Sequence, residues 1–194
     1  MTPPKLIYFR HGETDWNSQL RFQGQQDIAL NAHGREQARA NGQKLRELVG
    51  QGEGFQFISS PLGRSRETME IVRTQMGLDP MAYAVDNRLI EASYGVLEGT
   101  TLPEFKAASP EEHRYRKDNR WQYQPEGGES HAMVLERILP WYLSLECDSI
   151  VCAHGVVGRV LRRHLLGIEP EEAASYAFPQ DRVMVWQPGS ETMI

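Results

Sequence analysis

The chain has 194 residues, of which 40% are hydrophobic and 24% charged, and its formal net charge is −5. This is the composition of a globular protein of one or two domains, and it disfavours a general nucleic-acid binder or a protein of acidic membrane surfaces. No apolar run approaches the roughly 20 residues that cross a bilayer and the N-terminus lacks the form of a signal peptide, so we expect a cytoplasmic protein without membrane partners.

The first part of the chain predicts a strand followed by a helix. Residues 5–9 predict a buried strand, because an apolar run occupies residues 6–9. Asn31 is suited to cap a helix, and Ala38, Leu45 and Leu48 then recur at helical spacing. A strand–helix unit of this kind is the building block of an α/β domain.

A second unit follows directly. Residues 55–59 predict a short strand, and Ser60 followed by Pro61 predicts the N-cap and first position of a helix. This helix should run to about Met76, with Gly77 as its C-terminal stop. Residues 82–85 are a weaker strand candidate.

The second half of the chain continues the alternation. Residues 100–124 predict one or two short helices, residues 130–145 a helix, 149–153 a strand, 156–166 a helix and 182–187 a last strand. Alternating strands and helices predict an α/β fold, with a mostly parallel central sheet between two helical layers, α/β/α. We expect one domain over residues 1–194, with residues 100–128 as a lid or substrate-specificity segment.

Basic side chains follow three of the predicted strands. Arg10 and His11 end the first strand, Arg64 comes shortly after the second, and His154 ends the late strand. Because parallel α/β sheets bind ligands at the carboxyl ends of their strands, these four groups should meet in one crevice. Gathering them there without an anion would be costly, so a phosphate dianion is the expected ligand.

The sequence gives no sign of a metal site. It contains no P-loop, no HExxH pair and no acidic loop of the EF-hand type. We therefore expect phosphate chemistry without metal or cofactor, with arginines supplying the positive charge.

In its motifs the chain resembles the histidine phosphatase superfamily, in the phosphoglycerate-mutase-like branch. The resemblance spans nearly the whole chain and rests on segments in family order: RHGETDWN (10–17), RFQGQQDIAL (21–30), SSPLGRSRET (59–68), EASYGVLEG (91–99), GGES (127–130) and VCAHG (151–155). The first of these, together with the late His-Gly, is highly specific, whereas GGES alone is not.

The resemblance implies roles for individual residues. His11 would be the nucleophile that takes the phosphoryl group, and Glu91 the proton donor to the leaving oxygen. The expected contacts to the phosphoryl oxygens come from Arg10, Arg64 and His154, with Asn17 adding a hydrogen bond. The remaining expected substrate-binding residues are Gln23, Gly24, Tyr94 and Gly155. Gly12 and Gly155 would allow tight turns and close approach of the backbone to a ligand.

Three departures from the mutase pattern favour hydrolysis. Residues 91–95 read Glu-Ala-Ser-Tyr-Gly where mutases have Glu-Arg-His-Tyr-Gly, the chain is shorter than the mutases, and no Arg-Arg pair can be matched. We expect a metal-independent phosphomonoester hydrolase of the phosphatase branch, acting through phosphohistidine on a small-molecule phosphoester, as a monomer or homodimer. A cofactor-dependent phosphoglycerate mutase is the alternative, and a non-catalytic phosphate-binding protein the third hypothesis.

Two basic segments are open to more than one interpretation. Residues 100–128 interleave aromatic and basic side chains, which fits a pocket for a large or carboxylated phosphoester, but a surface helix packed on the domain is favoured. The arginines at 159, 162 and 163 are expected to form a solvated helix face.

Overall fold

The sheet at the centre of the molecule has the expected position and connections. The computed structural model describes residues 4–187 and 189–194, and this part of the chain forms a six-stranded sheet of order β3-β2-β4-β1-β5-β6. The strands are β1 (Leu6–Arg10), β2 (Gln56–Ser59), β3 (Ala84–Val85), β4 (Ser149–Ala153), β5 (Val183–Gln187) and β6 (Ser190–Met193). The first four are parallel to one another, whereas β5 and β6 are antiparallel additions at one edge. The sheet is therefore mixed, with a parallel majority.

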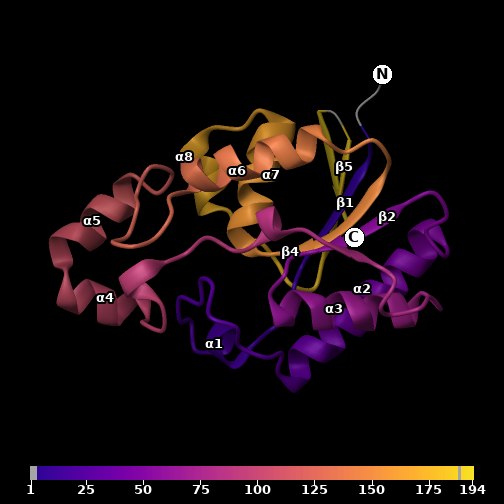
Figure 1. Cartoon of the computed structure of the whole chain (residues 1–194). Coiled ribbons are helices and arrows are strands. Elements are labelled where there is room, and N and C mark those ends of the chain that lie inside the picture. The colour runs from indigo at the N-terminus through magenta and orange to yellow at the C-terminus, as the bar shows by residue number, and fades with distance from the viewer. Residues whose placement is uncertain (1–3, 188) are drawn as a thin grey trace.

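Helices cover both faces of this sheet, as expected for three layers (Figure 1). The helices are α1 (Asp15–Ser18), α2 (Ala32–Val49), α3 (Gly63–Gln75), α4 (Leu102–Ala108), α5 (Pro110–Asp118), α6 (His131–Leu143), α7 (Gly155–Leu166) and α8 (Pro170–Ser175). Alternate residues of β1 point to opposite faces: Ile7 and Phe9 pack towards α2 and α3, and Leu6 and Tyr8 towards α6, α7 and α8. Both apolar cores are thus built on one strand that is buried on both sides.

The register of β1 and β4 aligns the ends of the two strands. Arg10 lies opposite Ala153 in the parallel pair, so the next residues, His11 and His154, leave the sheet at the same edge. The backbone N–H of His11 still donates to the Ala153 carbonyl at 3.0 Å. The expected meeting of the two histidines at the carboxyl edge is therefore confirmed.

The start of α3 differs from its prediction. The helix begins at Gly63 rather than at Pro61, and Ser60 is not its N-cap. The first N–H groups of the helix, those of Gly63 and Arg64, donate instead to the Asp27 carboxylate at 2.9 and 3.4 Å. The Ser60 hydroxyl lies 2.6 Å from His154 Nε2, which explains why it is not free to cap the helix.

Residues 100–128 form a small unit beside the sheet, with α4 and α5 far from the strands in Figure 1. Phe105 and Tyr123 pack with Leu97 in a cluster of their own, while Trp121 joins the core under α6 and α7. Three of the four aromatics of this segment thus pack on the domain as expected, whereas Tyr115 on α5 is 56% exposed. The cluster packs against Phe22 and Tyr94.

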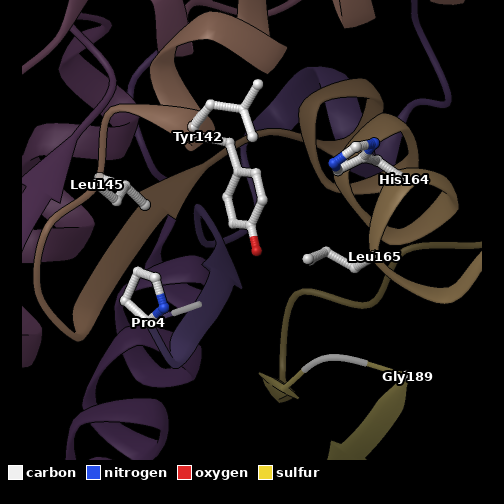
Figure 2. Close-up of a pocket in the computed structure, with 7 residues that line it drawn as sticks. Pro4, Tyr142, Leu145, His164, Leu165 and Gly189 are labelled. Atoms are coloured by element: carbon white, nitrogen blue, oxygen red, sulfur yellow. The ribbon is translucent and has the colours of Figure 1, made fainter. Parts of the chain in front are cut away.

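A cavity of about 410 Å³ lies away from the polar strand ends (Figure 2). It is lined mainly by apolar groups of the α6 and α7 ends, including Tyr142, Leu145 and Leu165, together with Pro4 and His164. This chemistry does not suit a phosphate group. Within the described ranges, no helix has the length and apolar character needed to span a membrane.

Candidate active site

His11 is held in one orientation at the floor of a small polar cavity. Its Nδ1 lies 2.7 Å from its neighbour's carbonyl oxygen, Gly12 O, and this contact makes Nδ1 the protonated nitrogen. Its Nε2 accepts a hydrogen bond from Arg64 Nε at 3.2 Å. The ring is therefore a neutral imidazole whose unprotonated nitrogen, Nε2, is hydrogen-bonded to Arg64, and His11 lines the cavity.

Burial and the neighbouring positive charges keep His11 neutral. Burial, and after it the charges of Arg64 and Arg10, hold the pKa of His11 well below its ordinary value of 6.5. Burial, followed by the charges of Arg64, His11 and Arg10, also lowers the pKa of His154 well below 6.5. A neutral imidazole is the form that can attack an electrophile.

Arg64 is fixed by the loop that follows the first motif. Its terminal nitrogens donate to Gly24 O at 2.7 Å and to Gln26 O at 2.6 Å. With the contact to His11, three of its five N–H groups are engaged by described residues, which leaves two for a ligand. Burial lowers the pKa of Arg64 to about 10, so the guanidinium still carries its charge at neutral pH.

Arg10 approaches the cavity from the end of β1. One terminal nitrogen donates to the Phe178 carbonyl at 3.1 Å, while its buried Nε has no hydrogen-bond partner among the described residues. A Cβ atom on Gly155 would stand 3.7 Å from the guanidinium carbon of Arg10 and 3.8 Å from Glu91 Oε2. The missing side chain at Gly155 thus leaves space between a cation and a carboxyl group.

His154 lies behind His11, with the two ring centroids 5.2 Å apart. Its backbone N–H donates to the Tyr8 hydroxyl at 2.9 Å, and that hydroxyl donates to the His154 carbonyl at 2.6 Å. The side chain is fully buried, and its Nδ1 has no hydrogen-bond partner within the described part of the chain. His154 is near the cavity but is not among the residues that line it.

Glu91 is fixed by two backbone N–H groups, one of which lies at the start of α7. The N–H of Val156 donates to both carboxyl oxygens at 3.2 and 3.3 Å, and the N–H of Ala92 donates to Oε1 at 2.9 Å. The positive end of a helix thus faces this carboxyl group. Glu91 is 7% exposed and lines the same cavity as His11.

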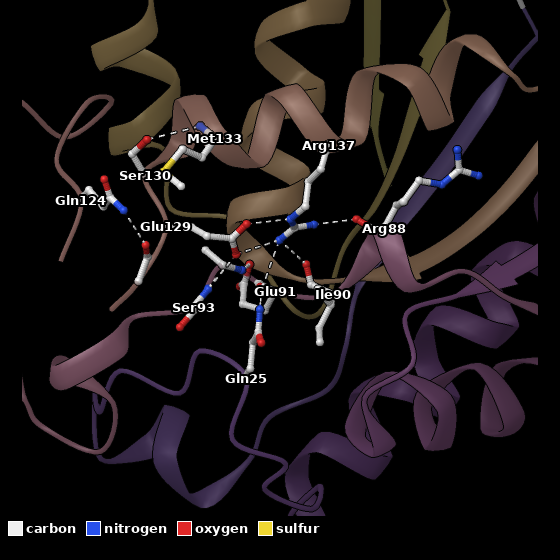
Figure 3. A network of polar contacts seen from close by, with 12 residues as sticks. Gln25, Arg88, Ile90, Glu91, Ser93, Gln124, Glu129, Ser130, Met133 and Arg137 are labelled. Carbon is white, nitrogen blue, oxygen red and sulfur yellow. Dashed lines mark hydrogen bonds and ion pairs between the residues drawn. The ribbon is translucent and has the colours of Figure 1, made fainter. Parts of the chain in front are cut away.

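The backbone around Glu91 is held by a second polar network, shown in Figure 3. Arg137 on α6 donates to the carbonyls of Arg88, Ile90 and Glu91 at 2.5, 2.8 and 3.2 Å. It also forms an ion pair with Glu129 at 2.9 Å, and the Glu129 carboxylate accepts the N–H of Ser93. The segment that carries Glu91 is therefore fixed on both sides, by α7 and by α6.

Asn17 lines the cavity with one atom free to donate. Its Oδ1 accepts from the Thr14 backbone N–H at 3.2 Å and from Gln180 Nε2 at 3.0 Å. The Asn17 amide nitrogen is therefore the group available to a ligand. Gln180 also donates to the His11 carbonyl at 3.0 Å, so one side chain ties together two parts of the first motif.

The remaining expected residues complete the wall. Gln23, Gly24, Tyr94 and Gly155 all line the cavity. Gln23 Oε1 is buried with no partner among the described residues, and Gly24 has φ +55°, a conformation that favours glycine. Burial, with the Glu91 carboxylate as second cause, raises the pKa of Tyr94.

The expectation for Gly12 is wrong. A Cβ there would lie 2.2 Å from Gly34 O, so its lack of a side chain serves the packing of two backbone segments and not the approach of a ligand. Gly155 lines the cavity, and a Cβ there would make contacts of ordinary length.

The expected solvated arginines of α7 are instead engaged. Arg159 lines the cavity and donates to Tyr176 O at 2.7 Å, Arg162 pairs with Glu191 at 2.9 Å, and Arg163 lies over the Trp121 ring. Arg159 is one helical turn after Gly155, and this spacing is the signal that would have placed it at the strand edge. Gln180 follows α8 in irregular chain and has no comparable signal.

The cavity as a whole suits one small anion. Its volume is about 110 Å³, and its lining comprises Arg10, His11, Asn17, Arg21, Phe22, Gln23, Gly24, Arg64, Glu91, Tyr94, Gly155 and Arg159. Four guanidiniums and two side-chain amides thus share this lining with a single neutral imidazole. Among the described residues, no group of three or more His, Cys, Asp or Glu side chains is arranged to hold a metal ion.

Comparison with known proteins agrees with this arrangement. The model of the histidine phosphatase superfamily (branch 1) matches residues 6–192. A probable phosphoglycerate mutase GpmB of Erwinia tasmaniensis is 37% identical, over 84% of this chain and 75% of its own length. A glucosyl-3-phosphoglycerate phosphatase of Mycolicibacterium vanbaalenii is 32% identical over 84% of this chain and 75% of that protein.

The fold agrees as well. The native structure of a mycobacterial glucosyl-3-phosphoglycerate phosphatase superposes with a TM-score of 0.78 at 27% identity, covering 94% of this chain and 89% of that one. The relatives thus include both phosphatases and mutases. The family model covers nearly the whole chain, and both the fold and the site around His11 agree with it. The chain therefore belongs to the histidine phosphatase superfamily.

Proposed function

We propose that this protein is a phosphomonoester hydrolase that works through a phosphohistidine at His11, without a metal ion. The observation that carries the proposal is the orientation of His11. Because Nδ1 is tied to the Gly12 carbonyl at 2.7 Å, Nε2 is the unprotonated nitrogen of a ring that lines a cavity of about 110 Å³ together with guanidinium groups. This geometry suits in-line attack on a bound phosphoryl group.

In the first step, the Nε2 lone pair of His11 leaves its hydrogen bond with Arg64 Nε and attacks phosphorus, and the bond from phosphorus to the ester oxygen breaks. Arg10, Arg64 and the Asn17 amide nitrogen donate to the non-bridging oxygens, where charge develops. The protonated carboxyl of Glu91 gives its proton to the leaving oxygen, and the product alcohol departs. His11 then carries the phosphoryl group and Glu91 is a carboxylate.

In the second step, the Glu91 carboxylate takes a proton from water as that water attacks the phosphorus of phosphohistidine. The bond from nitrogen to phosphorus breaks, inorganic phosphate leaves, and His11 returns to its neutral form. Glu91 regains its proton, so the cycle closes without any other reactant. The rigid mounting of Glu91 by α7 and Arg137 supports its use in both steps.

Two features favour a hydrolase over a phosphoglycerate mutase. Ala92 and Ser93 follow Glu91 where the mutase pattern has an arginine and a histidine. The mycobacterial phosphatase also superposes over nearly the whole chain. The similarity to the Erwinia protein, which is named a probable mutase, is the observation that keeps the mutase as second candidate.

The experiment is phosphate release from p-nitrophenyl phosphate in the presence of a chelator. We expect turnover by the wild type, none by His11→Ala, and an acid-labile, base-stable phosphoenzyme on rapid quench with a labelled substrate. Turnover that persists in His11→Ala contradicts the proposal. Interconversion of phosphoglycerates that requires a bisphosphoglycerate primer, with little release of phosphate, identifies the mutase instead.

Glu91→Gln tests the proton donor separately. Loss of general acid catalysis costs about 10²–10⁴-fold in rate where the leaving oxygen needs a proton. We therefore expect a loss of this size for alkyl phosphates and a much smaller loss for p-nitrophenyl phosphate, whose leaving group is stable as an anion. Equal losses for both substrates contradict the role given to Glu91.

A further inference from the structure

Gln180 connects His11 and Asn17 from a distant part of the chain. Its Nε2 donates to the His11 carbonyl at 3.0 Å and to Asn17 Oδ1 at 3.0 Å. Both acceptors are amide oxygens, so only the amino end of the Gln180 side chain can serve them. This nitrogen carries two N–H groups, and one is therefore used on each residue.

The contact with Gln180 helps to fix the direction of the Asn17 amide. Asn17 Oδ1 also accepts from the backbone N–H and the hydroxyl of Thr14, both at 3.2 Å. Thr14 precedes α1, whereas Gln180 comes from the segment between α8 and β5. Since donors from two sides hold the oxygen, the amide cannot turn over without losing them, and Nδ2 stays the group that Asn17 offers to a ligand of the cavity.

The peptide unit between His11 and Gly12 is held at both ends. Its carbonyl accepts from Gln180, and its N–H donates to the Thr68 hydroxyl at 3.1 Å. Thr68 is fully buried, and its hydroxyl donates in turn to Arg64 O at 2.7 Å. The next carbonyl along the chain, Gly12 O, is the one that lies 2.7 Å from His11 Nδ1. Fixing the plane of this peptide unit therefore helps to keep Gly12 O in line with the ring.

The segment that carries Gln180 is itself bound to α2. Asn41 is fully buried on this helix, and its Nδ2 donates to the Gln180 carbonyl at 2.9 Å. One turn later, Lys44 Nζ donates to the Asp181 carbonyl at 2.7 Å. The other buried residues of α2 are small or apolar, so Asn41 is an exception that a buried polar group makes only at a cost unless it is hydrogen-bonded. The bond to Gln180 gives this buried amide a structural task.

We propose that Gln180 is a positioning residue of the active site, which sets the His11–Gly12 peptide and the Asn17 amide in the arrangement needed for phosphoryl transfer. This inference rests on the proposed function for the roles of His11 and Asn17. Gln180 is not among the residues that line the cavity, so it acts through these two neighbours and not on the substrate. Asn41 holds it in place from α2. Such positioning matters because a displacement of about 1 Å can cost about 10²-fold in rate.

Gln180→Met tests this role, because it keeps the length of the side chain and removes both N–H donors. We expect kcat/KM for p-nitrophenyl phosphate to fall about 10- to 100-fold. The matched control is Gln56→Met, which removes an amide that donates to Ser149 Oγ at 2.8 Å, at the opposite end of the strands from His11. This control should leave kcat/KM unchanged. Equal losses in the two variants, or no loss in Gln180→Met, overturn the inference.

A double-variant cycle separates positioning from a purely structural role. Because part of the effect passes through Asn17, Gln180→Met should cost at least about three-fold less in kcat/KM when Asn17 is already replaced by alanine. A residue that only supports the fold lowers kcat/KM by the same factor in both backgrounds, and that outcome overturns the inference. Gln180→Asn, whose shorter amide cannot reach both oxygens, should show the same kind of loss and takes the place of Gln180→Met if that variant does not fold.

Two further measurements do not require turnover. Inorganic phosphate should bind to Gln180→Met about 3- to 10-fold more weakly than to the wild type by calorimetry, which corresponds to one weakened hydrogen bond. Nitrogen NMR of the His11 ring should show the Nδ1-protonated tautomer in the wild type and a mixture of tautomers in the variant. An unchanged phosphate affinity together with an unchanged tautomer overturns the inference. Absence of turnover in the wild type is a different result, since it contradicts the proposed hydrolase and leaves both measurements possible.

Discussion

The ion pair between Arg137 and Glu129 should be worth more to the fold than an ordinary surface pair. Arg137 donates to three carbonyls of the segment that carries Glu91, at 2.5, 2.8 and 3.2 Å, besides its pair with Glu129. The two side chains are 22% and 19% exposed, so water can replace part of what is lost. We propose Arg137→Met, Glu129→Gln and the double variant as the perturbation.

The magnitude follows from these contacts. Hydrogen bonds to charged groups contribute about 1.5–3 kcal/mol each, but part of this is recovered by solvent where the groups are a fifth exposed. We expect Arg137→Met to cost about 2–4 kcal/mol, because three carbonyls and one carboxylate lose a partner together. Glu129→Gln should cost about 1–2 kcal/mol. The coupling between the two changes should be about 1–2 kcal/mol.

The assay is urea denaturation of the four proteins of the cycle, with the slope of each transition compared. Arg88→Met is the matched control, because the Arg88 guanidinium pairs at 2.7 Å with Asp86 on the surface and is 45% exposed. It should cost less than about 1 kcal/mol. A coupling below about 0.5 kcal/mol, or a cost for Arg88→Met equal to that for Arg137→Met, refutes the view that this network fixes the Glu91 segment.

Three further predictions concern pH, packing and catalysis. The buried histidines have lower pKa values in the folded protein than in the unfolded chain, so the unfolded state binds more protons below about pH 6.5. The stability of the fold should therefore decrease as the pH drops from 6.5 to 5. This decrease should be smaller in His131→Gln, as measured by urea midpoints across the pH range. Gly12→Ala should reduce the free energy of unfolding by about 3 kcal/mol or more and so lower the thermal midpoint, because its Cβ would lie 2.2 Å from Gly34 O. Gly155→Ala, whose Cβ would make contacts of 3.7 Å, should fold normally. Similar thermal midpoints for the two variants would count against this packing argument. Arg64→Lys should lower kcat for p-nitrophenyl phosphate by about 10²–10³-fold, since an ammonium group cannot reproduce the guanidinium contacts; a lysine enzyme as fast as the wild type would show that these contacts are dispensable.

The features that the sequence predicted well depend on neighbours along the chain. Asn31 caps α2 by accepting the Gly34 N–H at 2.8 Å, and Ser130 caps α6 by accepting the Met133 N–H at 3.2 Å. Both are contacts over three residues, so the residue type alone indicates them. The carboxyl-edge position of His11 and His154 was also predictable, because each follows a buried apolar run that can only be a strand of the parallel sheet.

The features that were missed depend on residues that are distant in sequence. The cap of α3 comes from Asp27, 36 residues before Gly63, and this frees Ser60 to contact His154. Strand β6 forms because it pairs with β5 at the sheet edge, where its own pattern is too polar to predict it. In each case a local preference was outweighed by a partner that only folding supplies.

The sequence by itself determined that His11, Arg10 and Arg64 meet at one edge of the sheet, since each follows the end of a strand. Only the tertiary structure decided which of their atoms face the cavity, because the tautomer of His11 and the free N–H groups of Arg64 depend on carbonyls of other segments. The same holds for Arg159, whose guanidinium is held at the cavity by its hydrogen bond to the Tyr176 carbonyl. Orientation is a property of several segments packed together, and no single stretch of sequence encodes it.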